Sequence, residues 1–227
     1  SVLSNMELNH EIFKFFKNLK KNNNRDWFLL NKNLFVINQD LVKTFGEILK
    51  DRLNRFDTVD RFKLFRIYRD VRFSKNKTPY KTHFGLTWHR LKPKLRGGYY
   101  LHIEDKKSFL ACGFWAPNPK DLKRIREEIS YDSVELRSIL EDKDFQSIWG
   151  PLKGDEVKTS PRGFDINHPD IDLIRKKQFI VSIHFSNENV CSKNFIDVVE
   201  NALLKVRPFV NYMSEVLTTN ENGEPLY

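Results

Sequence analysis

The stretch from residue 98 to 114, GYYLHIEDKKSFLACGF, decides the predicted fold. Polar and apolar side chains alternate through residues 98–104, and residues 108–114 form a second strand-like run. Only Asp105, Lys106 and Lys107 separate the two runs, which is the length of a short hairpin loop. Strands linked this closely pair antiparallel, so the sequence predicts an antiparallel hairpin here.

Similar patterns extend from this hairpin in both directions. Further strands are expected at residues 84–89 and 179–185, and the alternation over residues 64–73 predicts another. Apolar residues at helical spacing predict helices at residues 12–19, 26–53, 119–129, 133–140 and 192–208. Elements in this order fit an α+β fold, a mainly antiparallel sheet packed by helices. We expect a single compact domain over residues 1–227, with a polar tail from about residue 218.

Length and composition exclude several classes of protein. The chain has 227 residues, of which 40% are hydrophobic and 30% charged, as in ordinary globular proteins. No apolar run approaches the roughly 18 to 20 residues of a membrane span, and residues 1–9 lack the features of a signal peptide. We therefore expect a cytoplasmic protein without membrane contact. The net charge of +9 favours polyanionic partners, so a nucleic acid is one alternative partner.

The sequence offers no recognised cofactor or metal motif. Cys112 and Cys191 are far apart and have no Cys-x-x-Cys spacing. His168 precedes two carboxylates, but no histidine or cysteine accompanies it at the spacing of a zinc site. There is also no nucleophile elbow and no phosphate-binding glycine loop. We therefore expect no metal and no cofactor.

Residues 66–83 carry the most function-like pattern. On a strand, Arg66, Tyr68, Asp70 and Arg72 share one face at a spacing of about 7 Å. Asp70 then orients two guanidinium groups, whose remaining donors form a planar fork for a phosphate or carboxylate. Arg69 breaks the pattern, because on a regular strand it points to the apolar side, where a charge has to be paired.

A basic turn follows this face. It carries Lys77 and Pro79, and the ring of Tyr80 can lie beside a ligand. His83 comes just beyond and titrates near neutral pH. If the protein is an enzyme, Asp70 and His83 are the expected proton carriers.

This segment resembles the hallmark of a protein family. The hallmark reads Arg-x-x-Arg-Asp-x-Arg-Phe, three free positions, Asp or Asn, Lys, x, Pro-Tyr, and residues 66–80 fill every position, with Asn76 as the amide option. Residues 23–28, 98–102 and 161–164 also look like family segments. The family is the domain of unknown function number 2461, widespread in bacteria and also found in fungi. The resemblance implies a compact domain of about this length and carries no assigned activity, cofactor or catalytic residue.

Three further places bear on function. Arg162 lies between Pro161 and Gly163 in a long loop, which can hold its guanidinium toward a ligand. His102 shares a strand face with Tyr100 and is either an ordinary sheet residue or, if that face also carries the arginines, part of an acid–base pair. The run from Trp88 to Lys94 can form an exposed stacking and phosphate patch.

The leading hypothesis is a basic pocket that binds a phosphate- or carboxylate-bearing small molecule. Its expected contacts are Arg66, Tyr68, Arg69, Arg72, Lys77, Tyr80 and Arg162, with Asp70 orienting the arginines. Two alternatives stay open. One is a nucleic-acid-binding module, and the other is a non-catalytic structural or interaction domain in which the motif is an ion-pair network.

Overall fold

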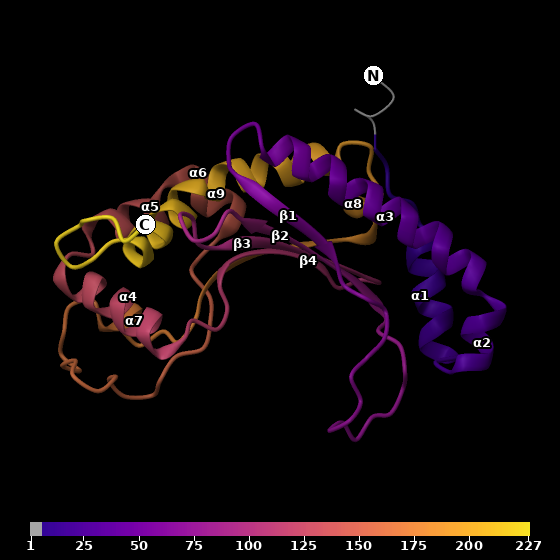
Figure 1. Cartoon of the computed structure of the whole chain (residues 1–227), viewed down its shortest axis with the longest axis horizontal. Coiled ribbons are helices and arrows are strands. Elements are labelled where there is room, and N and C mark those ends of the chain that lie inside the picture. The colour runs from indigo at the N-terminus through magenta and orange to yellow at the C-terminus, as the bar shows by residue number, and fades with distance from the viewer. Residues whose placement is uncertain (1–5) are drawn as a thin grey trace. The chain divides into compact units, whose positions relative to one another are not determined.

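The computed structural model describes residues 6–227 and shows the expected α+β fold (Figure 1). The described strands form an antiparallel sheet in the order β1 (Val59–Leu64), β2 (His83–Arg90), β3 (Gly98–Glu104), β4 (Ser108–Phe114) and β5 (Phe179–Phe185). The helices are α1 (Glu11–Lys21), α2 (Arg25–Leu30), α3 (Lys32–Leu53), α4 (Pro119–Tyr131), α5 (Val134–Glu141), α6 (Lys143–Trp149), α7 (Ile171–Ile174), α8 (Asn187–Val190) and α9 (Phe195–Thr218). Within residues 6–227, none of these helices combines the length and the apolar character needed to span a bilayer.

The chain divides into two units. The first comprises Ser1–Trp88, Tyr100–Leu110 and His184–Asn201, and the second comprises His89–Tyr99, Ala111–Ile183 and Ala202–Tyr227. Strands β2, β3, β4 and β5 each contribute residues to both units. The single domain expected over residues 1–227 stays a prediction.

Most predicted strands are confirmed, and one is wrong. The hairpin over residues 98–104 and 108–114 and the strand over residues 179–185 are confirmed to the residue, and β2 exceeds its prediction by one residue at each end. The strand predicted over residues 64–73 is wrong, because β1 ends at Leu64. The chain there leaves the sheet, so its alternating residues have no continuous partner strand.

The long helix predicted over residues 26–53 is interrupted. Asn31 ends α2 and precedes the first residue of α3. Its side-chain amide donates to the carbonyl of Trp27 at 2.8 Å, which satisfies one of the carbonyls exposed at a helix end. An asparagine in this position favours a break because its side chain competes for backbone hydrogen bonds.

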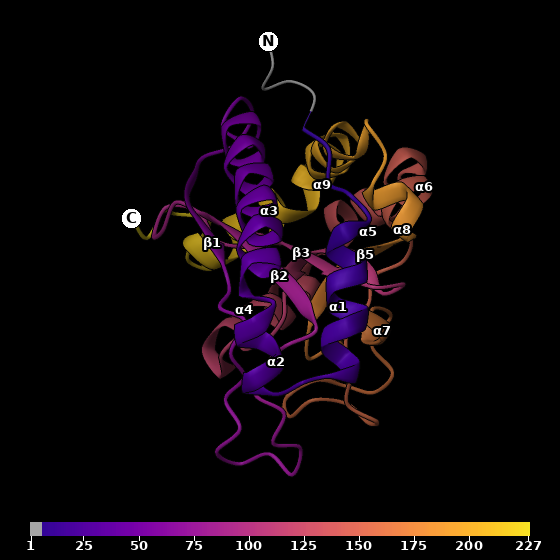
Figure 2. The same ribbon diagram turned by 90° about the vertical axis from the view of Figure 1, so that its right-hand side faces the viewer.

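In the first unit, α1 and α3 cover one face of the sheet (Figure 2). The ring of Phe84 on β2 lies 4.8 Å from Phe16 of α1 and 6.0 Å from Phe35 of α3, measured between ring centres. On β3, Leu101 and Ile103 are two residues apart, so they lie on the same face of the strand, and both are fully buried. Alternate residues of β2 and β3 therefore point away from this helical layer.

Gly46 lets α3 approach the sheet closely. The indole Nε1 of Trp88 donates to the carbonyl of Gly46 at 3.0 Å, and the ring of Phe62 on β1 stacks on Trp88. A Cβ at position 46 would lie 2.0 Å from Cζ of Phe62, well inside van der Waals contact. The glycine is thus needed for packing rather than for its backbone angles.

The second unit is built around the later part of α9. Trp149 of α6 donates from Nε1 to the carbonyl of Ala202 at 2.9 Å. The helix was predicted to end at Pro208, but it continues to Thr218 with this proline inside it. Phe209 and Val210 are fully buried, and we attribute the continuation to this packing, which offsets the backbone hydrogen bond that a proline removes.

We expect Gly46→Ala to destabilise the protein although alanine is the better helix former. The gain in helix propensity is about 1 kcal/mol. The clash with Phe62 should outweigh it and lower the free energy of unfolding by about 2 kcal/mol net. Urea denaturation followed by circular dichroism measures the change, with the exposed Lys43→Ala on the same helix as control. A Gly46→Ala protein as stable as this control would contradict the packing role.

Candidate functional site

Residues 65–82, called here the hallmark loop, leave the sheet after β1 and return to it at β2 (Figure 1). Their two arms are joined by the backbone hydrogen bonds from Arg69 to Pro79 (2.9 Å) and from Lys81 to Ile67 (2.8 Å). One isolated bridge pairs Tyr68 with Tyr80. The arms are extended, as their alternation suggested, but their pairing is too sparse to make a strand.

Arg69 is the internal cross-link of the hallmark loop. Its NH1 group donates to the carbonyls of Thr78 at 2.8 Å and Asn76 at 3.1 Å, and to the hydroxyl of Thr78 at 2.9 Å. A guanidinium whose donors are used in this way satisfies the pairing that its inward position requires. The geometry gives Arg69 a structural role. Its predicted ligand contact stays untested.

Asp70 and Arg72 form a local ion pair at the tip of the loop. Arg72 donates from Nε at 3.0 Å and from NH2 at 2.8 Å to the two oxygens of Asp70. The side chains are 77% (Arg72) and 51% (Asp70) exposed, so the pair is solvated. The hydrogen bond from Arg72 holds the pKa of Asp70 below its usual value, whereas Arg66 acts on this carboxyl only as a nearby charge. This pair is therefore neither a buried network nor part of an enclosed pocket.

Tyr80 anchors the loop to the helical layer. Its ring is 4% exposed and stacks on Phe28 of α2 at 4.1 Å. The amide side chain of Asn23 donates to the carbonyl of Tyr80 at 2.9 Å and accepts from its N–H at 3.1 Å. Asn23 belongs to one of the other family-like segments, so this contact joins two of them. The burial of Tyr80 leaves little of its ring for the predicted ligand contact.

A second group of polar residues lies on the face of the sheet opposite α1 and α3. His83 begins β2, and Tyr100, His102 and Glu104 alternate along β3. All four are half-buried, while their strand neighbours Phe84, Leu101 and Ile103 point into the helical layer. We call these four residues the sheet-face cluster.

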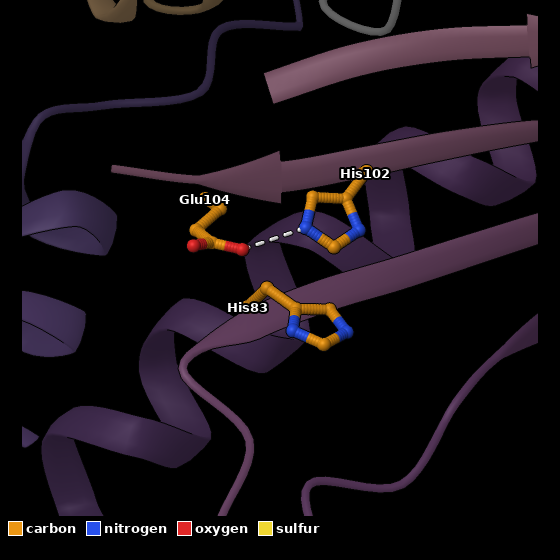
Figure 3. A group of neighbouring side chains, drawn as sticks. All are labelled: His83, His102 and Glu104. Atoms are coloured by element: carbon orange, nitrogen blue, oxygen red, sulfur yellow. Dashed lines mark hydrogen bonds and ion pairs between the residues drawn. The ribbon is translucent and has the colours of Figure 1, made fainter. Parts of the chain in front are cut away.

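Hydrogen bonds and ring stacking hold the sheet-face cluster together (Figure 3). Nδ1 of His102 lies 2.8 Å from the hydroxyl oxygen of Tyr100, and Nε2 lies 2.8 Å from Oε1 of Glu104. The ring of His83 stacks on His102 with 4.2 Å between centres, and Phe109 of β4 stacks on His102 at 4.7 Å. His102 is therefore fixed by four neighbours.

Burial sets the protonation of His83 and Tyr100. Burial, assisted by the neighbouring His102, lowers the pKa of His83 to about 4, so the expectation that His83 titrates near neutral pH is wrong and this imidazole is neutral at physiological pH. Burial and the charge of Glu104 raise the pKa of Tyr100 to about 12, so this phenol keeps its proton. Since a carboxylate accepts hydrogen bonds, Nε2 of His102 carries the proton donated to Glu104, and Nδ1 accepts from Tyr100.

Gly85 makes room for this arrangement. A Cβ at position 85 would lie 3.0 Å from the hydroxyl oxygen of Tyr100 and 3.3 Å from its ring. A larger residue at position 85 would therefore press on the phenol of Tyr100, which is hydrogen-bonded to His102. The glycine is a local feature of sequence that supports the cluster without contributing a functional group.

Three cations gather at the edge of the cluster. The ammonium groups of Lys63 and Lys81 lie 5.0 and 5.7 Å from the ring centre of Phe65, and Lys81 donates to the carbonyl of Arg66 at 2.7 Å. Burial and the charges of Arg66 and Lys63 all lower the pKa of Lys81. Within residues 6–227, no ion pair joins any of these three cations to a carboxylate. The charge of Lys81 also acts on the neutral His83, whose pKa it lowers.

The structure brings only part of the predicted site together. Arg66 and His83 lie near Lys81. Four other predicted residues lie elsewhere on the hallmark loop: Asp70, Arg72, the exposed Tyr68 and Lys77, which donates to the carbonyl of Val71 at 2.7 Å. Arg162 belongs to the second unit, and its ligand contact stays a prediction.

Other sequence expectations are changed by burial. Trp88 is fully buried and Arg90 is 2% exposed, so the stacking patch predicted there is wrong. His168 accepts at Nδ1 from the backbone N–H of Asp170 at 3.0 Å and has a structural role at the start of α7.

A pocket of about 780 Å³ in the second unit is lined by several carboxylates, including Glu127, Glu128 and Glu135, which does not suit an anion.

Sequence reasoning missed Glu104 and the nearness of His83 to His102. The signal for Glu104 was the alternation Tyr100-x-His102-x-Glu104, which puts three polar groups on one strand face. Pairing of His83 with this row depends on the neighbouring position of β2 and β3. His83, His102 and Glu104 each offer a metal ligand atom, and these atoms lie within 4.8 Å of one another.

We expect Arg69→Met to loosen the hallmark loop and Arg72→Met to leave it intact. Removing the guanidinium donors frees both arms, so the backbone amide protons of residues 69 and 81 should exchange at least about tenfold faster. Hydrogen exchange resolved by residue measures this. Arg72→Met, on the same loop but with a solvated partner, is the matched control. Equal exchange in both variants would remove the structural role of Arg69.

Comparison with known proteins confirms the family that the sequence resembles. The family described as "Conserved hypothetical protein (DUF2461)" matches residues 11–212, which includes the hallmark loop and the whole sheet-face cluster. Neither a curated protein nor a solved structure was found to match the chain. The match covers most of the 227 residues, and the chain therefore belongs to the DUF2461 family of conserved hypothetical proteins.

Proposed function

We propose that this protein binds a small molecule carrying a phosphate or carboxylate group, with the anion held by Lys63, Arg66 and Lys81. The observation that supports it is the gathering of these three cations, none of which forms an ion pair with a carboxylate among residues 6–227. Asp70, which is paired with Arg72, acts on Arg66 only as a nearby charge. Like charges held close together repel, and an anion bound between them removes that repulsion. The site differs from the predicted one in using Lys63 and Lys81 in place of the loop-tip residues.

The sheet-face cluster supports a location for the rest of such a molecule. Lys81 is two residues before His83 and its charge lowers the pKa of His83, which supports placing the anion beside the cluster. Phe65 is 36% exposed and offers an apolar surface beside the cations. Of the two expected proton carriers, His83 is the one near this site, while Asp70 is engaged by Arg72. A small anionic metabolite fits the cytoplasmic location expected from the sequence.

We expect Lys81→Ala to weaken anion binding by about ten- to a hundredfold. A charge-assisted hydrogen bond contributes about 1.5–3 kcal/mol, and each 1.4 kcal/mol corresponds to about tenfold in Kd. Calorimetric titration with phosphate, pyrophosphate and citrate measures Kd for the wild type and for Lys81→Ala and Arg66→Ala. The exposed Lys17→Ala on α1 is the control for loss of one positive charge.

Two outcomes would contradict the anion site. One is that none of the three anions binds the wild type at low ionic strength. The other is that Lys81→Ala and Lys17→Ala bind them equally, because binding would then follow net charge alone.

A nucleic-acid-binding function is the second candidate, and the tip of the hallmark loop is what favours it. Phe73 is 93% exposed, and the guanidinium of Arg72 lies 5.8 Å from its ring centre. Exposed aromatic rings beside cations stack on the bases of single strands.

On this alternative, Phe73→Ala should weaken binding of a mixed-sequence single-stranded oligonucleotide by about tenfold, since one stacking contact contributes about 1–3 kcal/mol. Fluorescence anisotropy over a series of salt concentrations measures both the affinity and its expected decline with salt. Leu30→Ala, another highly exposed apolar residue, is the control. Absence of binding at low salt would exclude this function.

The alternative of a structural or interaction domain accounts for part of the motif. Arg69 and Tyr80 have internal contacts that suit a fold-specifying role. The Asp70–Arg72 pair is solvated and contributes little to stability in such positions. A network confined to the motif therefore accounts for two of its residues and leaves the cations around Phe65 unexplained.

A further inference from the structure

We propose that His83, His102 and Glu104 form a binding site for a divalent transition-metal ion of the Zn²⁺ type. The site requires only these three residues, so it does not depend on the anion proposed above. It goes beyond that function by assigning a second kind of ligand to the same face of the sheet.

The geometry of β2 and β3 brings the side chains of His83, His102 and Glu104 together. His102 and Glu104 are two residues apart on β3, so both side chains leave the same face. His83 comes from the adjacent strand, and neighbouring strands lie about 4.8 Å apart. Ligand atoms of all three residues lie within 4.8 Å of one another. Figure 3 shows a ring nitrogen of each histidine on the side where the Glu104 carboxylate lies.

The separations suit a metal after a small adjustment. Two ligand atoms that are each about 2.0–2.1 Å from a tetrahedral ion lie roughly 3.3 Å from each other. Nε2 of His102 and Oε1 of Glu104 are 2.8 Å apart, so they need to open by only a fraction of an ångström. The ligand atom of His83 lies within 4.8 Å of the other two, and metal binding requires its ring to rotate out of the stack on His102 so that its lone pair points at the ion.

The surroundings of His102 are those of a metal ligand. When Nε2 binds a metal, Nδ1 carries the proton and donates to the Tyr100 hydroxyl oxygen, which lies 2.8 Å away. Ligating histidines almost always have such a partner, which fixes the orientation of the ring. Phe109 stacks on the same ring, and Gly85 leaves space for Tyr100.

The backbone that carries Glu104 is also fixed. The hydroxyl of Ser108, a fully buried residue, accepts from the N–H of Glu104 and lies 3.1 Å from its carbonyl oxygen. The carboxylate therefore extends from a rigid end of the β3–β4 hairpin. Preorganised ligands of this kind lose less freedom when a metal binds.

The number and type of ligands indicate the class of ion and of site. Two imidazoles and one carboxylate suit Zn²⁺, Fe²⁺ or Co²⁺ better than Mg²⁺ or Ca²⁺, which prefer oxygen ligands. Three protein ligands leave at least one coordination position open, as in catalytic rather than structural sites. Lys81 acts electrostatically on His83, and we propose that the anion it holds fills that position; only this last step rests on the proposed function.

The test is metal binding by the full chain. After treatment with a chelator and its removal, titration with Zn²⁺ should show one ion per chain, and Co²⁺ should give visible absorption typical of a nitrogen- and oxygen-ligated ion. Glu104→Gln and His102→Gln should each weaken Zn²⁺ binding at least a hundredfold. His184→Ala is the matched control, because His184 is exposed near Phe109 in the same unit and supplies none of the three ligands. Circular dichroism confirms that each variant is folded.

The outcomes separate the two proposals. Lys81→Ala should keep Zn²⁺ binding while weakening the anion, and Tyr100→Phe should lower Zn²⁺ affinity about ten- to a hundredfold. The metal site is wrong if the wild type binds no stoichiometric Zn²⁺ or Co²⁺, or if folded Glu104→Gln and His184→Ala proteins bind Zn²⁺ as tightly as each other. If Zn²⁺ binds as expected and no anion does, only the proposed function fails.

Discussion

The register between β2 and β3 is the constraint on which the candidate site depends. Successive residues of a strand face opposite sides, so one register puts Phe84, Leu101 and Ile103 into the helical layer and leaves His83, His102 and Glu104 on the other face. A slip by one residue would bury the polar row and expose the apolar one. The energy of burying the apolar row against α1 and α3 therefore fixes the polar row as well.

The ends of the hallmark loop lie closer to the proposed anion site than its tip does. Arg69 cross-links the two arms, and Tyr80 is held by Phe28 and Asn23. These contacts fix the arm that carries Lys81, which lies close to Arg66 and influences His83. Much of the motif can thus be understood as the support of a few cations, while the Asp70–Arg72 pair stays in solvent.

The two proposed ligands affect each other through charge. A metal ion at His83, His102 and Glu104 adds positive charge next to Lys81, which strengthens the attraction for an anion on the same face. By thermodynamic linkage the anion then strengthens metal binding by the same factor. Without any ligand, burial keeps His83 neutral and disfavours the charge of Lys81, so the protein avoids accumulating positive charge there.

The sequence by itself determined the α+β class, the hairpin of β3 and β4, β5 and the membership of the family, because these follow from local alternation and from a contiguous motif. It also gave Arg66 and His83 as candidate residues. Tertiary structure decided that residues 65–82 leave the sheet, that α9 continues past Pro208, and that Trp88 is buried. Only the pairing of strands, which depends on contacts between residues distant in the chain, brought His83 to His102 and Glu104. Periodicity shows which face a side chain takes, but the neighbour on that face is set by the packing of the whole sheet.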